Sequence, residues 1–133
     1  MNNFEKIEWL KKRLKEPLPG RSAHNKMIGR VLNVPHAIPE HVKLSAVLCL
    51  LFPQDNELYV TLMKRKEDEK HHSGQVSFPG GRHEKTDANL LATALREAEE
   101  EIGIESNKVE VVGALTPVYI MVSNFQVILL LDL

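Results

Sequence analysis

Cysteine and net charge are both scarce in this sequence, and each shortage excludes a kind of structure or partner. Cys49 is the only cysteine, so no internal disulfide can form, and its apolar neighbours favour a buried, inert thiol. The 17 Lys and Arg nearly balance the 18 Asp and Glu, which gives a formal net charge of −1. No global positive field therefore attracts polyanions, and we expect no nucleic acid and no membrane as partner.

Long hydrophobic runs are also missing. The longest, residues 46–52 and 127–131, fall far short of the roughly 20 residues that a membrane-spanning helix needs. Residues 1–17 contain neither an uninterrupted apolar segment nor a small-residue cleavage site, so they do not resemble a secretory signal. We expect a cytoplasmic protein, and the length of 133 residues with 43% hydrophobic composition predicts one domain with a real core.

The first 42 residues differ in pattern from the rest. Apolar residues recur at spacings of three and four between Phe4 and Leu14, which predicts an amphipathic helix that ends before Pro17. We expect this helix to dock on its own domain rather than on a membrane or a partner. Residues 21–41 show no sustained period and are broken by glycine or proline at three positions, Gly29, Pro35 and Pro39. The sequence thus predicts an N-terminal helix with an irregular connector over residues 1–42 and a compact domain over residues 43–133.

Strand patterns surround one strong helix pattern in that domain. Residues 43–52 and 58–63 predict a hairpin whose turn lies at residues 53–56, and residues 109–112 and 125–131 read as further strands. Pro79-Gly80-Gly81 is expected to break any strand. Thr86 or Asp87 is expected to cap a helix that runs to Ile102, with Gly103 as its left-handed end. The fold class is therefore mixed α/β (α+β).

The predicted helix carries an acidic face. Glu97, Glu100 and Glu101 stand at positions i, i+3 and i+4, so their carboxylates project from one side of the helix. We call these three residues the acidic trio. Like charges at this spacing cost roughly 0.2–0.5 kcal/mol per pair, which favours a cation among them, and hard oxygen ligands select Mg²⁺ or Mn²⁺. The alternative is a solvated acidic face on an ordinary surface helix.

Three neighbouring features favour the metal interpretation. The helix face opposite the trio is apolar and can pack on a sheet; its residues are Leu91, Ala94, Leu95, Ala98 and Ile102. Arg96 lies beside the trio, where its guanidinium can pair with one carboxylate and hold its orientation. Gly80 and Gly81 precede the helix and let the backbone approach a ligand closely. A glycine loop beside an acidic helix suits a metal-bound diphosphate.

At this point the residues resemble a known family. Gly81, followed by the run from Arg96 to Ile104, is similar to the Nudix box, whose pattern is GX5EX7REUXEEXGU with U an aliphatic residue. The second half of the pattern matches with Ala98 at the first aliphatic place. The stretch from Gly81 to Arg96 is one residue longer than the pattern, and Asp87 is the acid nearest to the first glutamate. The resemblance implies the Nudix fold, a mixed β-sheet packed with helices as an α/β/α sandwich.

A second motif narrows the resemblance to one subgroup. Residues 62–65, Leu-Met-Lys-Arg, and residues 72–81, His-Ser-Gly-Gln-Val-Ser-Phe-Pro-Gly-Gly, resemble the signature that precedes the box in coenzyme A pyrophosphatases. That subgroup also tends to carry the lengthened box. Residues 116–125 fit it as well, so the likeness covers the chain from about Lys43 onward.

The resemblance implies a reaction and a set of site residues. It implies hydrolysis of the diphosphate linkage of coenzyme A or acyl-coenzyme A to 3′,5′-ADP and 4′-phosphopantetheine, with Mg²⁺ or Mn²⁺ as cofactor and a small-molecule nucleotide as substrate. The implied metal ligands are Glu97, Glu100, Glu101 and the carbonyl of Gly81. The implied catalytic residues are Glu97, as ligand or base, and Arg96, as its orienting partner. The implied substrate-binding residues are Arg65, His72, Gly80 and Gly81.

Two alternatives stay open at this stage. Another nucleoside diphosphate, such as ADP-ribose or a dinucleoside polyphosphate, would use the same metal site. A catalytically silent Nudix module would bind a nucleotide without turnover. The family fold also continues past the strand at residues 125–131. We therefore expect either a chain that is incomplete at its C-terminus or a homodimer or strand exchange that covers an exposed apolar edge.

Overall fold

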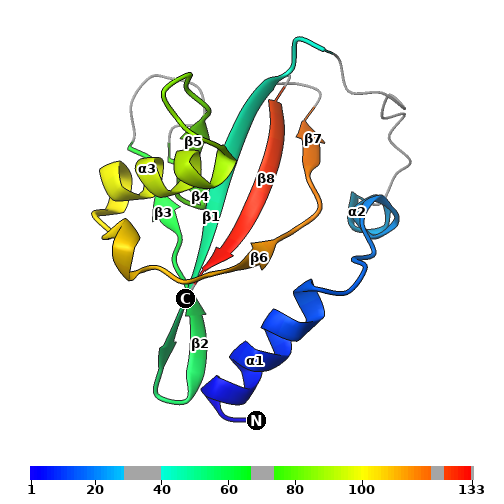
Figure 1. Ribbon diagram of the computed structural model, residues 1–133, viewed down its shortest axis with the longest axis vertical. Helices are drawn as coiled ribbons and strands as arrows, with labels where there is room; N and C mark the ends of the chain where they lie inside the picture. The colour runs from blue at the N-terminus through cyan, green and yellow to red at the C-terminus, as the bar shows by residue number, and fades with distance from the viewer. Residues whose placement is uncertain (29–39, 67–73, 121–124, 133) are drawn as a thin grey trace.

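The computed structural model describes residues 1–28, 40–66, 74–120 and 125–132, and all statements below refer to them (Figure 1). A mixed β-sheet occupies the centre, the helix at residues 90–102 packs against it, and the first helix, at residues 3–14, contacts the strand at residues 111–114. The helices are α1 (Asn3–Leu14), α2 (Arg21–Ile28), α3 (Leu90–Ile102) and the 3₁₀ turn η1 (Ser106–Lys108). The strands are β1 (Lys43–Gln54), β2 (Glu57–Val60), β3 (Met63–Lys64), β4 (Val76–Ser77), β5 (Gly80–Arg82), β6 (Val111–Ala114), β7 (Val118–Ile120) and β8 (Phe125–Asp132).

Strand β1 organises the sheet. The hydrogen-bonded order is β2-β1-β8-β6, with β5 also paired to β1 and β7 also paired to β8. β1 runs parallel to β8 over Lys43–Leu50 and antiparallel to β2 and β5. The predicted hairpin is confirmed, because Asp55 and Asn56 form its turn with φ of 49° and 62°. These two residue types tolerate the left-handed region that tight hairpins need.

The expectation of an exposed apolar edge at the last predicted strand is wrong. β8 lies between β1 on one side and β6 and β7 on the other, so both of its edges are hydrogen-bonded. Covering that edge therefore requires no second copy of the chain.

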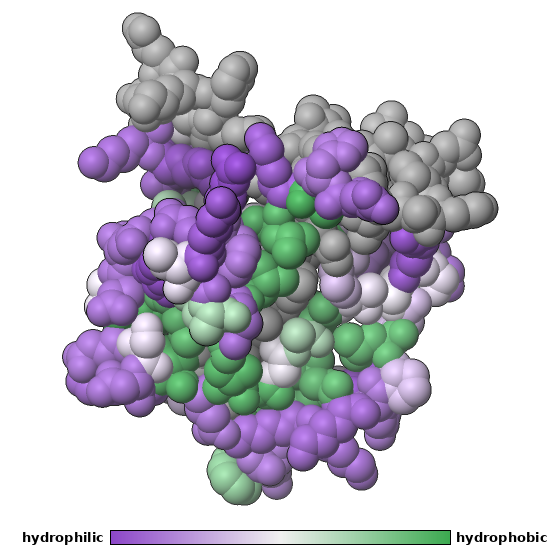
Figure 2. Space-filling view, turned by 45° about the horizontal axis from the view of Figure 1, so that its top comes forward, coloured by the Kyte–Doolittle hydropathy of each residue, from purple (hydrophilic) through white to green (hydrophobic). Residues whose placement is uncertain are grey.

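Figure 2 shows apolar side chains gathered on one face among polar ones, and exposed large hydrophobic residues in the described ranges include Tyr59, Leu62 and Val76.

Helix α3 packs on the sheet through a narrow buried face. Ala94 and Ala98 on the helix and Ala46 and Leu48 on β1 are all 0% exposed and form the core cluster. Small side chains on α3 let the helix approach the sheet closely, and partly buried Leu and Ile side chains surround this contact. The apolar face that the sequence predicts therefore does face the sheet. Cys49 is buried nearby, and burial raises the pKa of its thiol, consistent with an inert residue.

The ends of α3 show one correct and one wrong prediction. The helix ends at Gly103, whose φ of 71° is the expected left-handed end. It begins later than predicted, because Asn89 is the N-cap and its side chain accepts a hydrogen bond from the N–H of Ala92 at 2.8 Å. Thr86 does not cap the helix, and the carboxylate of Asp87 accepts from the N–H of Glu84 instead. Sequence alone did not distinguish these neighbouring cap-forming residues.

Helix α1 docks on its own domain, as expected. The ammonium of Lys11 lies 2.6 Å from the carboxylate of Glu110, and that of Lys6 donates to the carbonyl of Asn56 at 3.0 Å. A Cβ added at Gly113 of β6 would lie 2.9 Å from Leu14, so the end of the helix packs directly on the backbone of β6. None of the helix residues is fully buried. The docking therefore depends on polar contacts and partial burial.

Several other expectations need correction. Residues 21–28 form helix α2 rather than an irregular connector, because no glycine or proline interrupts them, while Gly29, Pro35 and Pro39 lie outside the described residues. The predicted strand at residues 58–63 is divided between β2 and β3, and that at 109–112 begins two residues later as β6. Strand β7 was not predicted at all. Gly80 and Gly81 lie within strand β5, paired to β1, because backbone pairing requires no side chain.

No helix in the described ranges is both long and apolar enough to cross a bilayer.

Candidate active site

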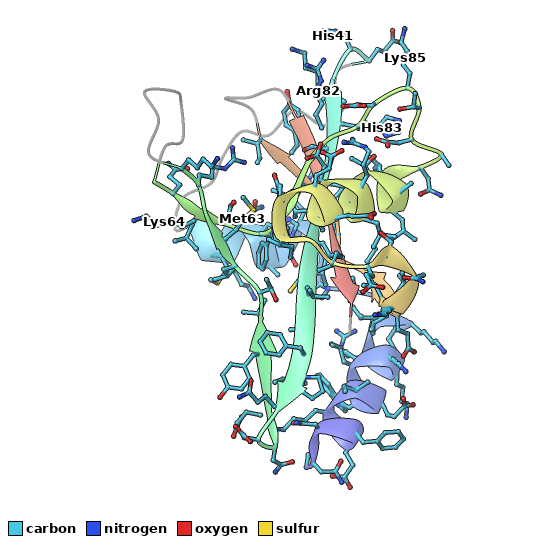
Figure 3. The ribbon with its side chains drawn as sticks, turned by 90° about the vertical axis from the view of Figure 1, so that its left-hand side faces the viewer. His41, Met63, Lys64, Arg82, His83 and Lys85 are labelled. Atoms are coloured by element: carbon cyan, nitrogen blue, oxygen red, sulfur yellow. The ribbon has the colours of Figure 1, made fainter. Side chains whose placement is uncertain are left out.

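Strand β5 and helix α3 bring the predicted site residues together. The N–H of Gly80 donates to the carboxylate of Glu101 at 3.0 Å, which connects strand β5 to helix α3. On its other side, β5 pairs with β1 at Val47, Ala46 and Ser45, and the N–H of Leu48 donates to the carbonyl of Pro79 at 2.7 Å. Figure 3 shows α3 in front of the sheet. Arg82 ends β5, and His83 begins the loop that leads from β5 to α3. Strand β5 thus lies between β1 and the acidic trio.

Both glycines are required by close contacts, but with different neighbours. A Cβ at Gly80 would lie 2.3 Å from the carbonyl oxygen of Ala46 and 2.5 Å from the Cα of Val47, and the φ of Gly80 is 154°. A Cβ at Gly81 would instead lie 2.6 Å from the carboxyl carbon of Glu97. Gly80 therefore allows strand packing, whereas Gly81 leaves space for the first carboxylate of the acidic trio.

Arg96 is the centre of the polar contacts at the site. Its Nε and Nη2 donate to the two carboxylate oxygens of Asp87 at 2.8 and 3.0 Å, a two-pronged contact with a side chain that is 5% exposed. Its Nη1 donates to Glu97 at 2.9 Å and lies 3.7 Å from Glu100. Its Nη2 also donates to the carbonyl of Arg82 at 3.1 Å. The prediction that Arg96 orients a carboxylate is compatible with these contacts, and Asp87 is the anchor that the sequence did not assign.

The charges of this cluster shift its pKa values. Hydrogen bonds from Arg96 hold the pKa of Asp87 well below its ordinary value of 3.8, and the N–H of Glu84 lowers it further. The same contact with Asp87 raises the pKa of Arg96. Asp87 and Arg96 are therefore charged at every physiological pH.

The pKa of Glu101 is raised above its ordinary value. Burial raises its pKa most, and the negative charges of Glu97 and Glu100 raise it further, whereas the N–H of Gly80 and the charge of Arg65 oppose the rise. The electrostatic effect of Glu97 and Glu100 on Glu101 means that the acidic trio shares one region of the surface. A positive charge placed there would favour all three ionised carboxylates.

A divalent cation suits this donor set. Carboxylate oxygens and a backbone carbonyl are the ligands that Mg²⁺ and Mn²⁺ prefer, and the mutual repulsion of the trio would be relieved by a cation. Among the described residues, however, no three Asp, Glu, His or Cys side chains are gathered as a ready-made metal cluster. Arg96 contacts Glu97 through one carboxylate oxygen, Oε1, and the N–H of Gly80 contacts Oε2 of Glu101. The metal role of Glu97, Glu100, Glu101 and Gly81 stays a prediction.

The predicted substrate-binding residues are only partly placed. Arg65 follows β3, and its N–H donates to the carbonyl of Gln75 at 2.9 Å, so the two parts of the upstream motif lie side by side. Its exposed guanidinium is near enough to affect the pKa of Glu101. His72 lies outside the described residues. Gly80 and Gly81 lie directly against the trio.

Sequence reasoning missed two polar residues, Thr93 and His83. Thr93 is 0% exposed on the packed face of α3, and its hydroxyl lies 2.8 Å from Nδ1 of His83. One signal was available, since a threonine interrupts the otherwise apolar face of the helix between Leu91 and Ala94. Their contact with Asp87 was not visible, because it joins a loop to a helix.

Comparisons with known proteins identify the family of this chain. The family model of the NUDIX domain matches residues 42–128. A protein of Klebsiella aerogenes named "Uncharacterized Nudix hydrolase NudL" is 45% identical over 95 residues, which are 70% of this chain and 76% of that protein. A protein of the same name from Pectobacterium atrosepticum is 50% identical over 66 residues, which are 50% of this chain but 34% of that protein. Most of that longer relative thus has no counterpart in the match.

Solved structures share the fold. A Nudix hydrolase from M. smegmatis, RenU, superposes with a TM-score of 0.55 at 20% identity, covering 66% of this chain and 58% of that one. The Ap4A hydrolase of C. elegans superposes with a TM-score of 0.54 at 17% identity, covering 68% of this chain and 67% of that one. At such identities the likeness concerns the arrangement of the backbone alone. The matched domain and the 45% identical relative show that this chain, in which a glycine strand contacts an acidic helix, belongs to the Nudix hydrolase family.

Proposed function

We propose that this domain hydrolyses the diphosphate linkage of coenzyme A or acyl-coenzyme A, releasing 3′,5′-ADP and 4′-phosphopantetheine or its acyl form. The observation that carries the hydrolase role is the contact of β5 with α3, where Gly80 binds Glu101 and Gly81 leaves space for Glu97. The substrate class rests on the upstream motif, residues 62–65 and 72–81, which resembles that of coenzyme A pyrophosphatases.

In this reaction the site residues would bind the metal ion, accept a proton and orient a catalytic side chain. When bound, Mg²⁺ or Mn²⁺ neutralises the diphosphate and lowers the pKa of a water ligand. Glu97, Glu100, Glu101 and the carbonyl of Gly81 would hold the cation. Glu97 is also the candidate that accepts the proton of the attacking water, and Arg96 restricts its rotation through the 2.9 Å contact.

Arg65 is the residue best placed to contact the substrate. Its charge lowers the pKa of Glu101, which supports a position of the guanidinium on the same side of the domain as the trio. Arginine recognises phosphate by two parallel hydrogen bonds, and the 3′-phosphate of coenzyme A adds a group that ADP-ribose lacks. We therefore expect Arg65→Ala to raise KM for coenzyme A more than KM for the same substrate without its 3′-phosphate.

A substrate panel tests the function. The purified chain is assayed with Mg²⁺ and then Mn²⁺ against coenzyme A, acetyl-coenzyme A, ADP-ribose and diadenosine tetraphosphate, and phosphopantetheine release is followed for the first substrate. We expect coenzyme A and its acetyl form to have the highest kcat/KM. Preference for ADP-ribose or the dinucleotide would assign the site to another nucleoside diphosphate, and absence of turnover with all four would indicate a silent module.

Paired variants test the role of the acidic trio. Glu100→Gln combined with Glu101→Gln is expected to abolish turnover and to leave the fold intact, because each change preserves size and hydrogen bonding but removes charge. Glu99→Gln is the matched control on the same helix, since Glu99 contacts Ser106 rather than the trio. Hydrolysis that survives in the double variant would contradict the metal role.

A further inference from the structure

We propose that the imidazole of His83 and the hydroxyl of Thr93 hold the carboxylate of Asp87 in place, and that Asp87 in turn fixes Arg96 and so the orientation of Glu97. We call these five residues the polar relay. The proposal rests on the proposed hydrolase function and assigns His83 and Thr93 as positioning residues for it.

The first part of the polar relay is the buried hydroxyl of Thr93. The residue is 0% exposed and lies on the face of α3 that packs on the sheet, where every other buried residue is alanine. A buried hydroxyl is costly unless it is hydrogen-bonded. Its Oγ1 lies 2.8 Å from Nδ1 of His83, 3.0 Å from Oδ2 of Asp87 and 3.2 Å from the carbonyl of Asn89. The hydroxyl thus connects the helix to the loop that follows β5.

The number of protons in this contact determines the tautomer of His83. A threonine hydroxyl has one proton, while the ionised carboxylate of Asp87 and the carbonyl of Asn89 can only accept. If the hydroxyl donated to His83, its own lone pairs would face both of these oxygens. The favourable arrangement therefore has Thr93 donating toward Asp87 and His83 donating from Nδ1 to Thr93. His83 must carry its proton on Nδ1.

The second part of the polar relay is the fork between Asp87 and Arg96. One carboxylate oxygen accepts from Nε at 2.8 Å, and the other accepts from Nη2 at 3.0 Å, so the two planar groups meet edge to edge. This second oxygen, Oδ2, is the one bound by Thr93, and the N–H of Glu84 also donates to it at 2.9 Å. Rotation of the carboxylate would turn the guanidinium plane with it.

The third part is the clamp on Glu97. Nη1 of Arg96, fixed by the fork, donates to Oε1 of Glu97 at 2.9 Å. On its other side Glu97 is packed against Gly81 so closely that a Cβ there would lie 2.6 Å from its carboxyl carbon. A turn of the guanidinium would therefore either move the carboxylate of Glu97 with it or break this hydrogen bond. The hydroxyl of Thr93 and the carboxylate of Glu97 are thereby coupled without direct contact.

Two variants of Thr93 separate positioning from packing. Thr93→Val has nearly the same shape but lacks the hydroxyl, and Thr93→Ser keeps the hydroxyl but loses a methyl group. We expect Thr93→Val to reduce kcat for coenzyme A by roughly 10- to 100-fold with KM nearly unchanged, the scale expected for a misplaced catalytic group. Thr93→Ser should retain kcat within about threefold of wild type, because positioning depends on the oxygen. A purely structural role predicts the reverse order, with the serine variant at least as impaired as the valine variant.

Nuclear magnetic resonance gives a readout that does not depend on turnover. At about pH 8, where an ordinary imidazole is neutral, long-range ¹H–¹⁵N spectra should show His83 protonated on Nδ1. The Nε–H signal of Arg96 should exchange slowly with water in wild type and faster in Thr93→Val. A proton on Nε2 of His83, or an unchanged Arg96 signal in Thr93→Val, would overturn the polar relay.

These readouts keep the two proposals apart. If wild type hydrolyses none of the panel substrates while the His83 and Arg96 signals behave as expected, the proposed function fails and the polar relay stands as a structural contact. If wild type hydrolyses coenzyme A and Thr93→Val does so with unchanged kcat, the function stands and the positioning role is refuted.

Discussion

The same substitution at two adjacent glycines should affect stability and activity to different extents. Gly80→Ala places a Cβ 2.3 Å from the carbonyl oxygen of Ala46 and 2.5 Å from the Cα of Val47. These are backbone atoms of the central strand and cannot rotate away. The φ of 154° adds strain, since only glycine adopts this region readily. Strain of about 1–3 kcal/mol and overpacking of about 1–3 kcal/mol together give a loss of about 2–6 kcal/mol in the free energy of unfolding.

Gly81→Ala meets a different neighbour. The new Cβ would lie 2.6 Å from the carboxyl carbon of Glu97, which is the far end of a flexible side chain. Glu97 can turn away, at the cost of its hydrogen bond with Arg96, so we expect a loss of about 1–2 kcal/mol in the free energy of unfolding. Because the displaced carboxylate is the proposed ligand and base, kcat for coenzyme A should fall by about 100-fold.

Urea unfolding and steady-state kinetics on both variants provide the comparison. Gly103→Ala is the control for strain alone, since Gly103 has a φ of 71° and no atom within 4 Å of an added Cβ. It should lose about 1–2 kcal/mol and keep its kcat. The reasoning is refuted if Gly81→Ala loses as much stability as Gly80→Ala, or if Gly81→Ala hydrolyses coenzyme A at the rate of wild type.

Four further outcomes are expected. Asn89→Ala should lower the free energy of unfolding by about 1 kcal/mol in urea, because the N–H of Ala92 loses its cap. Leu48→Ala should lower it by about 2–5 kcal/mol, since the side chain is 0% exposed in the core; a loss under 1 kcal/mol would contradict that packing. Asp87 has a lowered pKa, so its stabilisation is present above the ordinary value of 3.8 and is lost as pH falls through the folded value; Asp87→Asn should therefore make unfolding less sensitive to pH in the acid range. Arg96→Lys should reduce kcat by roughly 10- to 100-fold, because one ammonium cannot hold both carboxylates; kinetics equal to wild type would show that the fork is dispensable.

Local signals predicted the elements that depend on neighbouring residues. The period of apolar residues located α1, a left-handed glycine ended α3, and turn residues placed the hairpin at Asp55 and Asn56. The acidic trio was also visible, because positions i, i+3 and i+4 share a helix face in any fold. Such features depend on chain geometry over one or two turns, which sequence determines directly.

Contacts between distant segments were not predictable in the same way. Strand β5 consists of glycines and an arginine, and only its pairing with β1 makes it a strand. The last predicted strand was expected at an edge, but β6 and β7 cover it. Asp87 has the appearance of a helix cap in sequence, yet Arg96, nine residues later, uses its carboxylate instead. A polar side chain often has several chemically acceptable partners. The packing of the sheet and the helix determines which of them lies within hydrogen-bond distance.

The sequence by itself determined the chemistry available to this protein: a close-approach glycine, three carboxylates on one helix face and an arginine among them. Those features follow from residue type and helical period, which no tertiary contact alters. Only the tertiary structure decided how they are used. The position of β5 between β1 and α3 lets the N–H of Gly80 donate to Glu101 and places Gly81 against the carboxyl group of Glu97. The same packing buries Thr93 and directs its hydroxyl to Asp87, since a buried polar group must find a partner and the fold supplies that one.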